Sequence, residues 1–431
     1  MGDAVVVSAF ECVTPAGRSA DETWRALSAG RSGVRAFAGY RTEGAVSAGA
    51  PLPACAAEIP MAVDELAGSP VRLARSAEPG YHAARLVVAR ALRRLSMSGP
   101  RHDPERIAMI GAASFGEPAA WAPGVGGSGP DSRPQSARTP SSPPPSQHPQ
   151  GALGLIATEH GLEGPCFMVG SACSSGAQAV YVAASLIRSG AIDAAVVVGH
   201  EFPLSPGNVA SLDRMSVLYR PDDPRDRARS EPARASRPFS RDRRGFVLAE
   251  AAAALVLSSA PCADRRGWPR LAGLRGAFAC GDADLVSHPS LEGVGRCVRG
   301  AMADAWLGPE GIGCVHAHAT SSPSGDRAEL GGLRHALGAT FPAVPVVASK
   351  SQLGHALGAS ALLSIGLAIR GMAEGVVLPT LHHEPDPSLP APRVSAASAA
   401  HPHKTAMVNA FGLGGANVTL IFSRGPDARP A

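Results

Sequence analysis

The sequence predicts an α/β protein in which buried strands alternate with helices. Short runs of β-branched and small apolar residues recur along the 431 residues, and Ala/Leu-rich segments of helical length follow them. This alternation is typical of sheets that are covered on both faces. Hydrophobic residues make up 45% of the chain and aromatic residues only 4%. The core is therefore expected to be large and built mainly from Ala, Val and Leu.

The expected strands are spread over the whole chain, and the helices between them have recognisable ends. The strands are the runs at 4–10, 106–114, 191–200, 246–258, 312–319, 344–350 and 406–412. Asp21 is expected to cap a helix over 22–29, because its side chain can accept the free N–H groups of a first turn. Two Ala-rich helices are expected at 175–188 and 359–370, each followed by a glycine that ends it.

Two segments depart from this pattern. Residues 118–150 are rich in Pro, Ser and Gly, and the eight prolines between positions 123 and 149 exclude a regular helix or strand. This composition indicates a flexible insertion. Residues 220–244 hold nine arginines against five acidic residues. Strand-like and helix-like runs continue on both sides, so neither segment is expected to divide the chain into independent domains.

The charge and cysteine content exclude several classes of protein. A net charge of +4 is too small to indicate nucleic-acid binding, although residues 220–244 hold four more arginines than acids. That segment is either a solvated loop or a landing site for an acidic partner. The eight cysteines form no CxxC pair and no zinc-binding set, so we expect reduced thiols.

No targeting or membrane-spanning segment is predicted. The first apolar run is short and follows Asp3, as expected for a first strand rather than a signal peptide. No stretch approaches the ~20 uninterrupted apolar residues that cross a bilayer. We therefore expect a cytoplasmic protein that binds neither membranes nor nucleic acid.

Cys173 is the strongest candidate nucleophile. It lies in GSACSSGAQAVYVAASLIRSG (170–190), among small residues and directly before a predicted helix. The free N–H groups and dipole of a helix N-terminus favour an anion, so we expect a lowered pKa for this thiol. The small neighbours would let a thioester approach. Taken alone, the segment also fits a packed core cysteine, which is the favoured interpretation of the other seven.

Three C-terminal segments carry groups that could assist this nucleophile. His318 follows an apolar run in VHAHATSSPSGDRAEL, and Lys350 and His355 lie in SKSQLGHALGAS. The glycine-rich turn NAFGLGGAN (409–417) could bring its backbone close to a substrate. Each signal is weak alone. A metal pair at His316 and His318 lacks a third ligand at suitable spacing, so no metal site is predicted.

Together these segments resemble the β-ketoacyl synthases, the elongating condensing enzymes of fatty-acid and type II polyketide assembly in the thiolase-like superfamily. The family signatures are an ACSS nucleophile, an AHGTxTP histidine, a KSxxGH pair and a terminal NxFGxGG turn. Here they read SACSSG, AHATSSP, KSQLGHALGAS and NAFGLGGAN, in the same order. The similarity extends from residue 4 to residue 422.

The resemblance implies a thiolase-like fold of five layers, α-β-α-β-α, made of two duplicated halves. The N-terminal half would span 1–258 and contain the nucleophile, the flexible insertion and the arginine-rich loop. The C-terminal half would span 259–424 and supply the catalytic histidines and lysine. Residues 425–431 would form a tail.

The resemblance also implies the reaction. Cys173 would take an acyl group from a carrier thioester, and His318 and His355 would act on a malonyl thioester during a decarboxylative Claisen condensation. Lys350, paired with Glu329, would hold the two histidines in place.

The terminal turn would complete the implied site. The backbone N–H groups of Cys173 and Leu413 would form the oxyanion hole, and Phe411 would support the same turn. Several positions depart from the family pattern: Ala319 and Leu413 stand where relatives carry Gly and a gating Phe. These departures suggest a specialised member.

The implied partner is an acyl carrier protein whose phosphopantetheine arm delivers the thioester, so no cofactor of the protein's own is expected. A homodimer, or a heterodimer with a ketosynthase-like subunit, is also implied. One alternative is a non-catalytic partner subunit of the chain-length-factor kind, although such subunits commonly replace the nucleophile with Gln. The other alternative is an acyltransferase or thiolase on the same fold.

Overall fold

The computed structural model describes residues 4–37, 53–60, 79–95, 103–115, 149–283 and 289–425. The insertion predicted at 118–150 lies outside these residues, except for Pro149 and Gln150, which begin helix α4 (Pro149–His160). The predicted tail also lies outside them, apart from Gly425.

The strands of the main sheet form two sets of five. The first set has the hydrogen-bonded order β5 (Cys166–Val169), β4 (Ile107–Ala112), β6 (Ala194–Glu201), β7 (Ala251–Ser259), β1 (Val5–Val13). The second set has the order β10 (Val346–Val347), β9 (Cys314–His316), β13 (Thr405–Gly412), β14 (Ala416–Ser423), β8 (Ala272–Gly281).

The two sets repeat one pattern of strand directions. In the first, β5, β4 and β6 are parallel, and β7 and β1 are each antiparallel to the strand before them in the sheet. In the second, β10, β9 and β13 are parallel, and β14 and β8 follow antiparallel. Two residue pairs, Val6–Gly273 and Val7–Ala272, join β1 to β8. The fold is therefore a duplicated α/β unit whose two copies meet at these strands.

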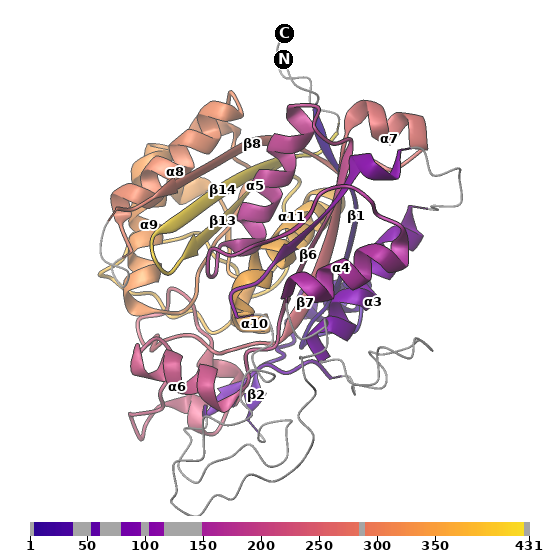
Figure 1. Cartoon of the computed structure of the whole chain (residues 1–431). Coiled ribbons are helices and arrows are strands. Elements are labelled where there is room, and N and C mark those ends of the chain that lie inside the picture. Colours follow the sequence, from indigo (N-terminus) through magenta and orange to yellow (C-terminus); the bar gives the residue numbers. More distant parts are fainter. Residues whose placement is uncertain are drawn as a thin grey trace, which may run out of the picture.

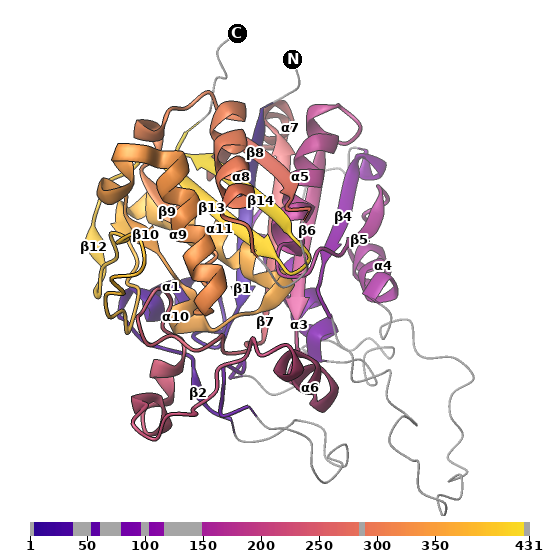
Figure 2. The ribbon, with the colours of Figure 1, turned by 90° about the vertical axis from the view of Figure 1, so that its left-hand side faces the viewer.

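Helices cover both faces of each set of strands. Helices α5 (Ser175–Arg188) and α11 (Ser360–Glu374) lie between the two sets and pack against each other (Figure 1). Helices α3 (Pro79–Arg94) and α4 cover the outer face of the first set, and α8 (Leu291–Asp304) and α9 (Pro323–Leu337) lie outside the second (Figure 2). The layers run α-β-α-β-α, so the predicted fold class is confirmed.

Successive residues of a strand point to opposite faces and so supply different layers of the core. In β1, Val5 and Val7 belong to the central core between the two sets, whereas Val6 belongs to the outer core beneath α3 and α4. In β14, Leu420 belongs to the central core and Ile421 to the outer core beneath α8 and α9. Both faces of both sets are therefore apolar, as the near-continuous apolar runs of the sequence predict.

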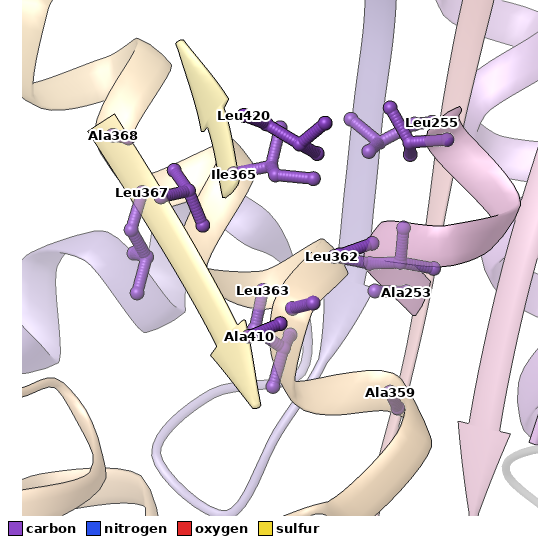
Figure 3. Packing of buried hydrophobic residues seen from close by; sticks show 14 of the residues in the cluster. Ala253, Leu255, Ala359, Leu362, Leu363, Ile365, Leu367, Ala368, Ala410 and Leu420 are labelled. Carbon is purple, nitrogen blue, oxygen red and sulfur yellow. The ribbon is translucent and has the colours of Figure 1, made fainter. Parts of the chain in front are cut away.

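Helix α11 runs through the central core. Figure 3 shows its Leu362 beside Ala253 and Leu255 of β7, and its Ile365 beside Leu420 of β14. Residues 357–374 are the one stretch of the described chain that is long and apolar enough to cross a membrane, and 83% of it is buried inside the protein. Packing between the two sets of strands accounts for this apolar character.

The N-termini of α5 and α11 lie close together. A Cβ atom at Gly176 would lie 2.7 Å from the carbonyl oxygen of Gly358. A side chain at this position would force the two helices apart. Gly176 of the SACSSG motif therefore lets the turn that carries Cys173 meet the turn that carries His355.

Several element boundaries differ from the predicted ones. The helix at 175–188 is confirmed, but α11 runs on past Gly371 to Glu374 and is capped by Gly375, whose φ is +66°. Helix α1 (Ala20–Ser28) begins one residue before Asp21, and the Ser19 hydroxyl accepts the Glu22 N–H at 3.2 Å. The prediction that Asp21 caps this helix was therefore wrong. Strands β5, β8 and β14 were not predicted.

The remaining elements are short. They are the helices α6 (Pro206–Arg214), α7 (Ala260–Arg266) and α10 (Lys350–Leu353), and the two-residue strands β2 (Arg35–Ala36), β3 (Cys55–Ala56), β11 (Val376–Val377) and β12 (Ala399–Ala400). Short 3₁₀ turns complete the described chain, two of which, at 227–229 and 232–235, lie in the arginine-rich segment.

Candidate active site

The four sequence motifs meet in one cavity of about 310 Å³. Cys173 follows β5, His318 follows β9, Lys350 and His355 follow β10, and Leu413 follows β13. Each of these strands belongs to the parallel part of its half, and sites in α/β proteins form beyond the carboxyl ends of such strands. The cavity is lined by Cys173, His318, His355, Phe411 and Leu413, together with residues of α8 and α9 and of neighbouring loops, including the loop that follows α6.

Cys173 lies in a tight turn between β5 and α5 and is 6% exposed. Ala172 before it has a φ of +48°, which residues with a Cβ atom adopt only rarely. Serines hold the turn: the Ser171 N–H donates to Ser175 Oγ at 2.9 Å, and Ser174 Oγ donates to the Ser171 carbonyl at 2.7 Å. The turn is therefore both strained and well bonded, which is common where a side chain has to be held in one position.

The prediction that the pKa of Cys173 is lowered is wrong. Burial raises the pKa of this thiol to about 11, in spite of the opposing charge of Lys350. The N–H groups of Leu413 and of Cys173 itself also lower it, but they do not outweigh burial. A helix N-terminus alone therefore leaves Cys173 as a neutral thiol, and its attack on a substrate requires a proton acceptor.

Two backbone N–H groups converge on the Cys173 sulfur, those of Leu413 and of Cys173 itself. They are the same groups that the resemblance implies for an oxyanion hole. Gly412 makes this approach feasible, because a Cβ atom at that position would lie 2.6 Å from the Ser171 carbonyl oxygen. The glycine-rich turn thus packs directly onto the nucleophile turn, as its composition predicts.

His318 and His355 lie side by side in the cavity. Their ring centroids are 5.4 Å apart and their ring planes are nearly perpendicular, at 86°. The ring of Phe246 lies 5.1 Å from His355, and that of Phe411 lies 5.8 Å from His318. Burial, followed by the charge of Lys350, holds the pKa of both imidazoles well below 6.5. Both are therefore neutral at neutral pH.

His355 makes one ring hydrogen bond among the described residues, through Nδ1. Its Nδ1 lies 3.0 Å from the hydroxyl of Ser360, at the start of α11. Its Nε2 is buried and has no hydrogen-bond partner among the described residues. With Ser360 as donor, the ring proton of His355 lies on Nε2, where it is available to a substrate.

Lys350 and Glu329 do not form the expected direct ion pair. Lys350 Nζ donates to the His318 carbonyl at 2.6 Å. The Glu329 carboxylate instead accepts the N–H groups of His318 and Ala319, each at 2.7 Å. Glu329 still acts on Lys350 electrostatically, although burial lowers the pKa of this lysine to about 8. The two residues therefore hold His318 from opposite sides of its backbone.

Ala319 explains part of this arrangement. It stands where the family carries glycine, and its φ of +42° lies in the left-handed region that glycine adopts without strain. The bond from its N–H to Glu329 offsets that strain. The departure from the family motif therefore leaves the backbone beside His318 in the conformation that a glycine would favour.

Sequence reasoning missed the polar groups behind Glu329. Asn409 Nδ2 donates to Glu329 Oε1 at 3.2 Å, and Thr419 Oγ1 donates to Asn409 Oδ1 at 3.0 Å. Asn409 opens the NAFGLGGAN motif, so its position was visible in the sequence. Its contact with Glu329, 80 residues away, was not.

Glu201 was also missed. It ends β6, is fully buried, and accepts the N–H groups of Ser114, Phe115 and Gly358. Burial raises its pKa to about 7. It therefore ties the loop after β4 to the turn before α11, beside the Cys173 turn. A single acid at the end of an apolar strand carries no periodic signal that would have revealed this role.

His316 takes no part in the cavity. Burial, with a contribution from His403, lowers its pKa to about 3. The part of the chain that the structure describes contains no group of three or more His, Cys, Asp or Glu side chains arranged to hold a metal ion.

Comparison with known proteins gives a consistent picture. The family model described as "Beta-ketoacyl synthase, N-terminal domain" matches residues 2–263, and the one described as "Beta-ketoacyl synthase, C-terminal domain" matches residues 271–384. A curated relative, 3-oxoacyl-[acyl-carrier-protein] synthase 2 of Vibrio cholerae, is 36% identical over 276 residues. This match covers 63% of the chain and 65% of the relative, so it falls short of the relative's full length.

Solved structures share the whole fold. A ketosynthase of a type II polyketide synthase, in complex with its acyl-carrier protein and bound to a hexaketide, superposes with a TM-score of 0.84 at 22% identity, covering 99% of this chain and 100% of the other. The ishigamide ketosynthase/chain length factor superposes with a TM-score of 0.80 at 25% identity, covering 99% of this chain and 100% of the other.

Proposed function

The chain belongs to the β-ketoacyl synthase family, and from this premise we propose that it catalyses a decarboxylative Claisen condensation. An acyl group held on Cys173 is joined to the two-carbon unit of a malonyl thioester, and CO₂ leaves. The product is a β-ketoacyl thioester. The departures at Ala319 and Leu413 favour a specialised fatty-acid or type II polyketide pathway as the setting.

One observation carries this proposal: a single cysteine shares the cavity with two neutral histidines. Cys173 is the only cysteine among the described residues that line the cavity. A nucleophile alone would suit an acyltransferase, whereas two uncharged imidazoles side by side can also donate hydrogen bonds to one carbonyl oxygen. This pairing favours condensation over simple acyl transfer.

In the first half-reaction, Cys173 attacks the carbonyl carbon of an acyl-carrier thioester. Its thiol proton passes to a neutral imidazole of the cavity, because burial keeps the thiol from ionising by itself. The oxyanion that forms accepts hydrogen bonds from the N–H groups of Cys173 and Leu413. Collapse of this intermediate expels the carrier thiol, which takes up the proton, and leaves the acyl group on Cys173.

In the second half-reaction, the bond between the malonyl α-carbon and its carboxylate breaks, and its electron pair forms an enolate. His318 and His355 stabilise the enolate oxygen by donating N–H hydrogen bonds to it. The enolate carbon attacks the acyl carbonyl on Cys173, and Cys173 leaves as a thiolate. Lys350 and Glu329 support this step indirectly, since both bind the backbone that positions His318.

Both acyl groups are proposed to arrive on the phosphopantetheine arm of an acyl carrier protein, so the arm is a substrate and the enzyme needs no cofactor of its own. The name of the Vibrio cholerae relative and the carrier complex of the polyketide ketosynthase support this assignment. The alternative, a non-catalytic chain-length-factor-like subunit, is disfavoured because Cys173 and both histidines are present.

Mass spectrometry of the protein after incubation with an acyl carrier tests the proposal. We expect an acyl adduct on Cys173, and CO₂ release when malonyl carrier is added. An adduct without CO₂ release would identify an acyltransferase. The absence of any adduct would identify a non-catalytic subunit.

Because both histidines are neutral, the rate of malonyl decarboxylation is expected to depend little on pH just below neutrality. We expect malonyl decarboxylation to stay constant as the pH falls from about 7.5 to about 6, because imidazoles whose pKa lies well below 6.5 take up no proton in this range. Lys350, whose pKa is about 8, is mainly protonated at pH 7.5 and becomes fully protonated as the pH falls. The rate is measured on the Cys173→Gln variant, which removes titration of the thiol. A rate that halves near pH 6.5 would show that the histidines titrate normally.

The arginine-rich segment is the proposed landing site for the acidic carrier. Met215, Ser216 and Val217 line the cavity, and the segment begins three residues later. Two of its arginines are structural, since Arg237 binds Asp226 at 2.7 Å and Arg243 binds Asp386 at 2.7 Å. These buried pairs cannot take part in docking.

Three arginines of this segment are exposed, and none of them forms an ion pair closer than 3.4 Å with a described residue. Arg225 is 92% exposed and lies 3.4 Å from Asp223, and Arg227 is 63% exposed and lies 3.6 Å from Glu231. The exposed Arg229 donates to the Pro221 carbonyl. Exposed pairs of this kind contribute little to stability, so these charges can be changed without unfolding the protein.

Reversing Arg225, Arg227 and Arg229 to Glu is expected to raise the KM for carrier-bound substrate about tenfold and to weaken its dependence on salt. Turnover of a small thioester mimic should stay unchanged, because the mimic reaches Cys173 without docking. Steady-state kinetics with both substrates at two salt concentrations measures the difference.

A matched control reverses three exposed arginines elsewhere, Arg25 of α1, Arg93 of α3 and Arg265 of α7. None of them lines the cavity, and α7 lies at the end of the molecule opposite α6 (Figure 1). If both triple variants raise the carrier KM equally, net charge rather than this segment governs docking. If neither does, the segment is a solvated loop.

A second ketosynthase-like subunit is proposed to cover the edge of the first set of strands. β5 is an edge strand, and its residues, Cys166, Phe167, Met168 and Val169, are apolar and only partly buried. Proteins normally cover such an edge. The ketosynthase/chain length factor assembly supports a heterodimer as well as a homodimer.

A further inference from the structure

Two cysteines outside the catalytic groups face each other between β8 and α8. Cys280 is partly exposed near the end of β8, and Cys297 is buried in α8. When protonated, Cys280 Sγ donates to the carbonyl of Gly293 at 3.7 Å, one helical turn before Cys297. Cys297 Sγ donates to the carbonyl of Phe278 at 3.4 Å, two residues before Cys280. Residues four apart share a helix face and residues two apart share a strand face, so the two thiols point at each other.

Glycines on α8 bring the helix unusually close to the strands at this place. A Cβ atom at Gly293 would lie 3.1 Å from the Asn417 side chain, and one at Gly300 would lie 2.4 Å from the Phe278 ring. Cys297 lies between these glycines on the same face of the helix. Since a disulfide requires Cα atoms about 4.4–6.8 Å apart, such close packing is what a helix-to-strand disulfide needs.

The surroundings of Cys280 are those of a reactive thiol. The guanidinium of Arg296 lies beside it and donates to the Gly281 carbonyl at 2.6 Å. Contact with the Cys297 side chain, together with Arg296, lowers the pKa of Cys280 to about 6, whereas the contact with Cys280 and burial raise the pKa of Cys297. A thiolate beside a protonated thiol is the arrangement of an attacking and a resolving cysteine.

The other described cysteines do not share this setting. Burial raises the pKa of each of them, namely Cys12, Cys55, Cys166, Cys173, Cys262 and Cys314. Cys280 is therefore expected to react first with an electrophile or an oxidant at neutral pH.

We propose that Cys280 and Cys297 form a redox pair that hydrogen peroxide converts reversibly into a disulfide. The Cys280 thiolate attacks one peroxide oxygen, the O–O bond breaks, and the leaving hydroxide takes a proton to become water. The Cys297 sulfur then attacks the sulfur of the Cys280 sulfenic acid, and a second water leaves with the Cys297 proton. Two thiols lose two electrons, and one peroxide is reduced to two waters. A dithiol reductant restores both thiols.

The pair lies directly behind one wall of the active-site cavity. Asn417 is the cross-strand neighbour of Cys280, lines the cavity, and donates to Asp282 at 2.6 Å. Val294 of α8 lines the same wall. A disulfide would fix the first turns of α8 to β8 and so hold this wall of the cavity in place. The redox chemistry itself does not depend on the proposed reaction.

Peptide mapping of the full-length Cys173→Ala protein tests the pair without a contribution from the active-site thiol. The protein is treated with hydrogen peroxide, its free thiols are blocked, and it is digested without reductant. We expect a peptide pair joined by a Cys280–Cys297 disulfide, which dithiothreitol separates. Iodoacetamide should alkylate Cys280 at least about tenfold faster than Cys262 at neutral pH, with a midpoint near pH 6.

Two further variants, each with one additional substitution in the Cys173→Ala protein, test the role of each cysteine. Cys297→Ser should leave Cys280 as a sulfenic acid that dimedone traps, whereas Cys262→Ser should form the same disulfide as its parent. Recovery of both thiols unlinked after oxidation, or alkylation of Cys280 no faster than that of Cys262, would overturn the proposal. Neither readout uses condensation, so failure here is distinguishable from failure of the proposed reaction.

Discussion

Replacing Cys173 with alanine is expected to abolish acyl transfer and to lower condensation on the order of 10⁴-fold or more, because no other group in the cavity can carry the acyl chain. The fold should remain intact, since alanine fits among the small neighbours Gly170, Ala172 and Gly176. Removing one buried sulfur costs about 1 kcal/mol, which shifts Tm by only a few degrees. Intact mass after incubation with acyl carrier and a thermal melt measure both effects.

A glutamine at the same position separates the two half-reactions. Cys173→Gln is expected to lose acyl transfer but to keep malonyl decarboxylation, because the histidines remain and the glutamine amide resembles an acylated thiol. CO₂ release from malonyl carrier measures what remains. Normal condensation by the alanine variant would exclude Cys173 as the nucleophile.

Replacing either His318 or His355 with alanine is expected to slow decarboxylation about 10²–10³-fold, as found for the loss of one preorganised donor to an oxyanion. Acylation of Cys173 should fall far less, because the backbone N–H groups that hold the oxyanion of that step remain and the other histidine of the cavity can still accept the thiol proton. Single-turnover assays of each half-reaction give the two rates separately.

His316→Ala is the matched control for these variants. It also removes a buried imidazole close to His318, but His316 does not line the cavity. We expect it to change stability while leaving the ratio of the two half-reactions unaltered. If His318→Ala slows acylation and decarboxylation to the same degree, its effect is a general structural defect and the assigned role is wrong.

The members of the site could be predicted from the sequence because each lies in a local motif. Cys173 stands out through its small neighbours and the helix after it, and the turn at 409–417 through its glycines. These features are short-range, so spacing and composition reveal them. The meeting of the three C-terminal motifs follows from the parallel strands β9, β10 and β13 that precede them, since the carboxyl ends of such strands lie at one edge of a sheet. The Cys173 turn of the other half joins them where the N-termini of α5 and α11 meet.

The electrostatics of the site could not be predicted in the same way. The pKa of Cys173 depends on burial by residues distant in sequence, and this effect exceeds that of the helix N-terminus. The contact of Lys350 with the His318 carbonyl, rather than with Glu329, depends on how β9 and β10 pair. Such effects are set by tertiary packing and leave no periodic pattern.

Fold class was predictable for a related reason. Apolar runs separated by Ala-rich segments indicate buried strands and helices, whatever their order in space. Strand β5 escaped prediction because it is only four residues long, and β14 because it follows β13 after a three-residue turn. The pairing of β1 with β8, which joins the two halves, rests on two residue pairs and has no sequence signature.

In the proposed mechanism, a single cavity both holds the acyl group on Cys173 and decarboxylates the malonyl unit that attacks it. The most direct test isolates the acylated protein, mixes it with malonyl carrier, and follows the acyl adduct, CO₂ and carrier product in the same sample. We predict that the adduct disappears as CO₂ and a β-ketoacyl carrier two carbons longer form in equal amounts. CO₂ release that leaves the Cys173 adduct in place, or loss of the adduct as free acid, would contradict the claim.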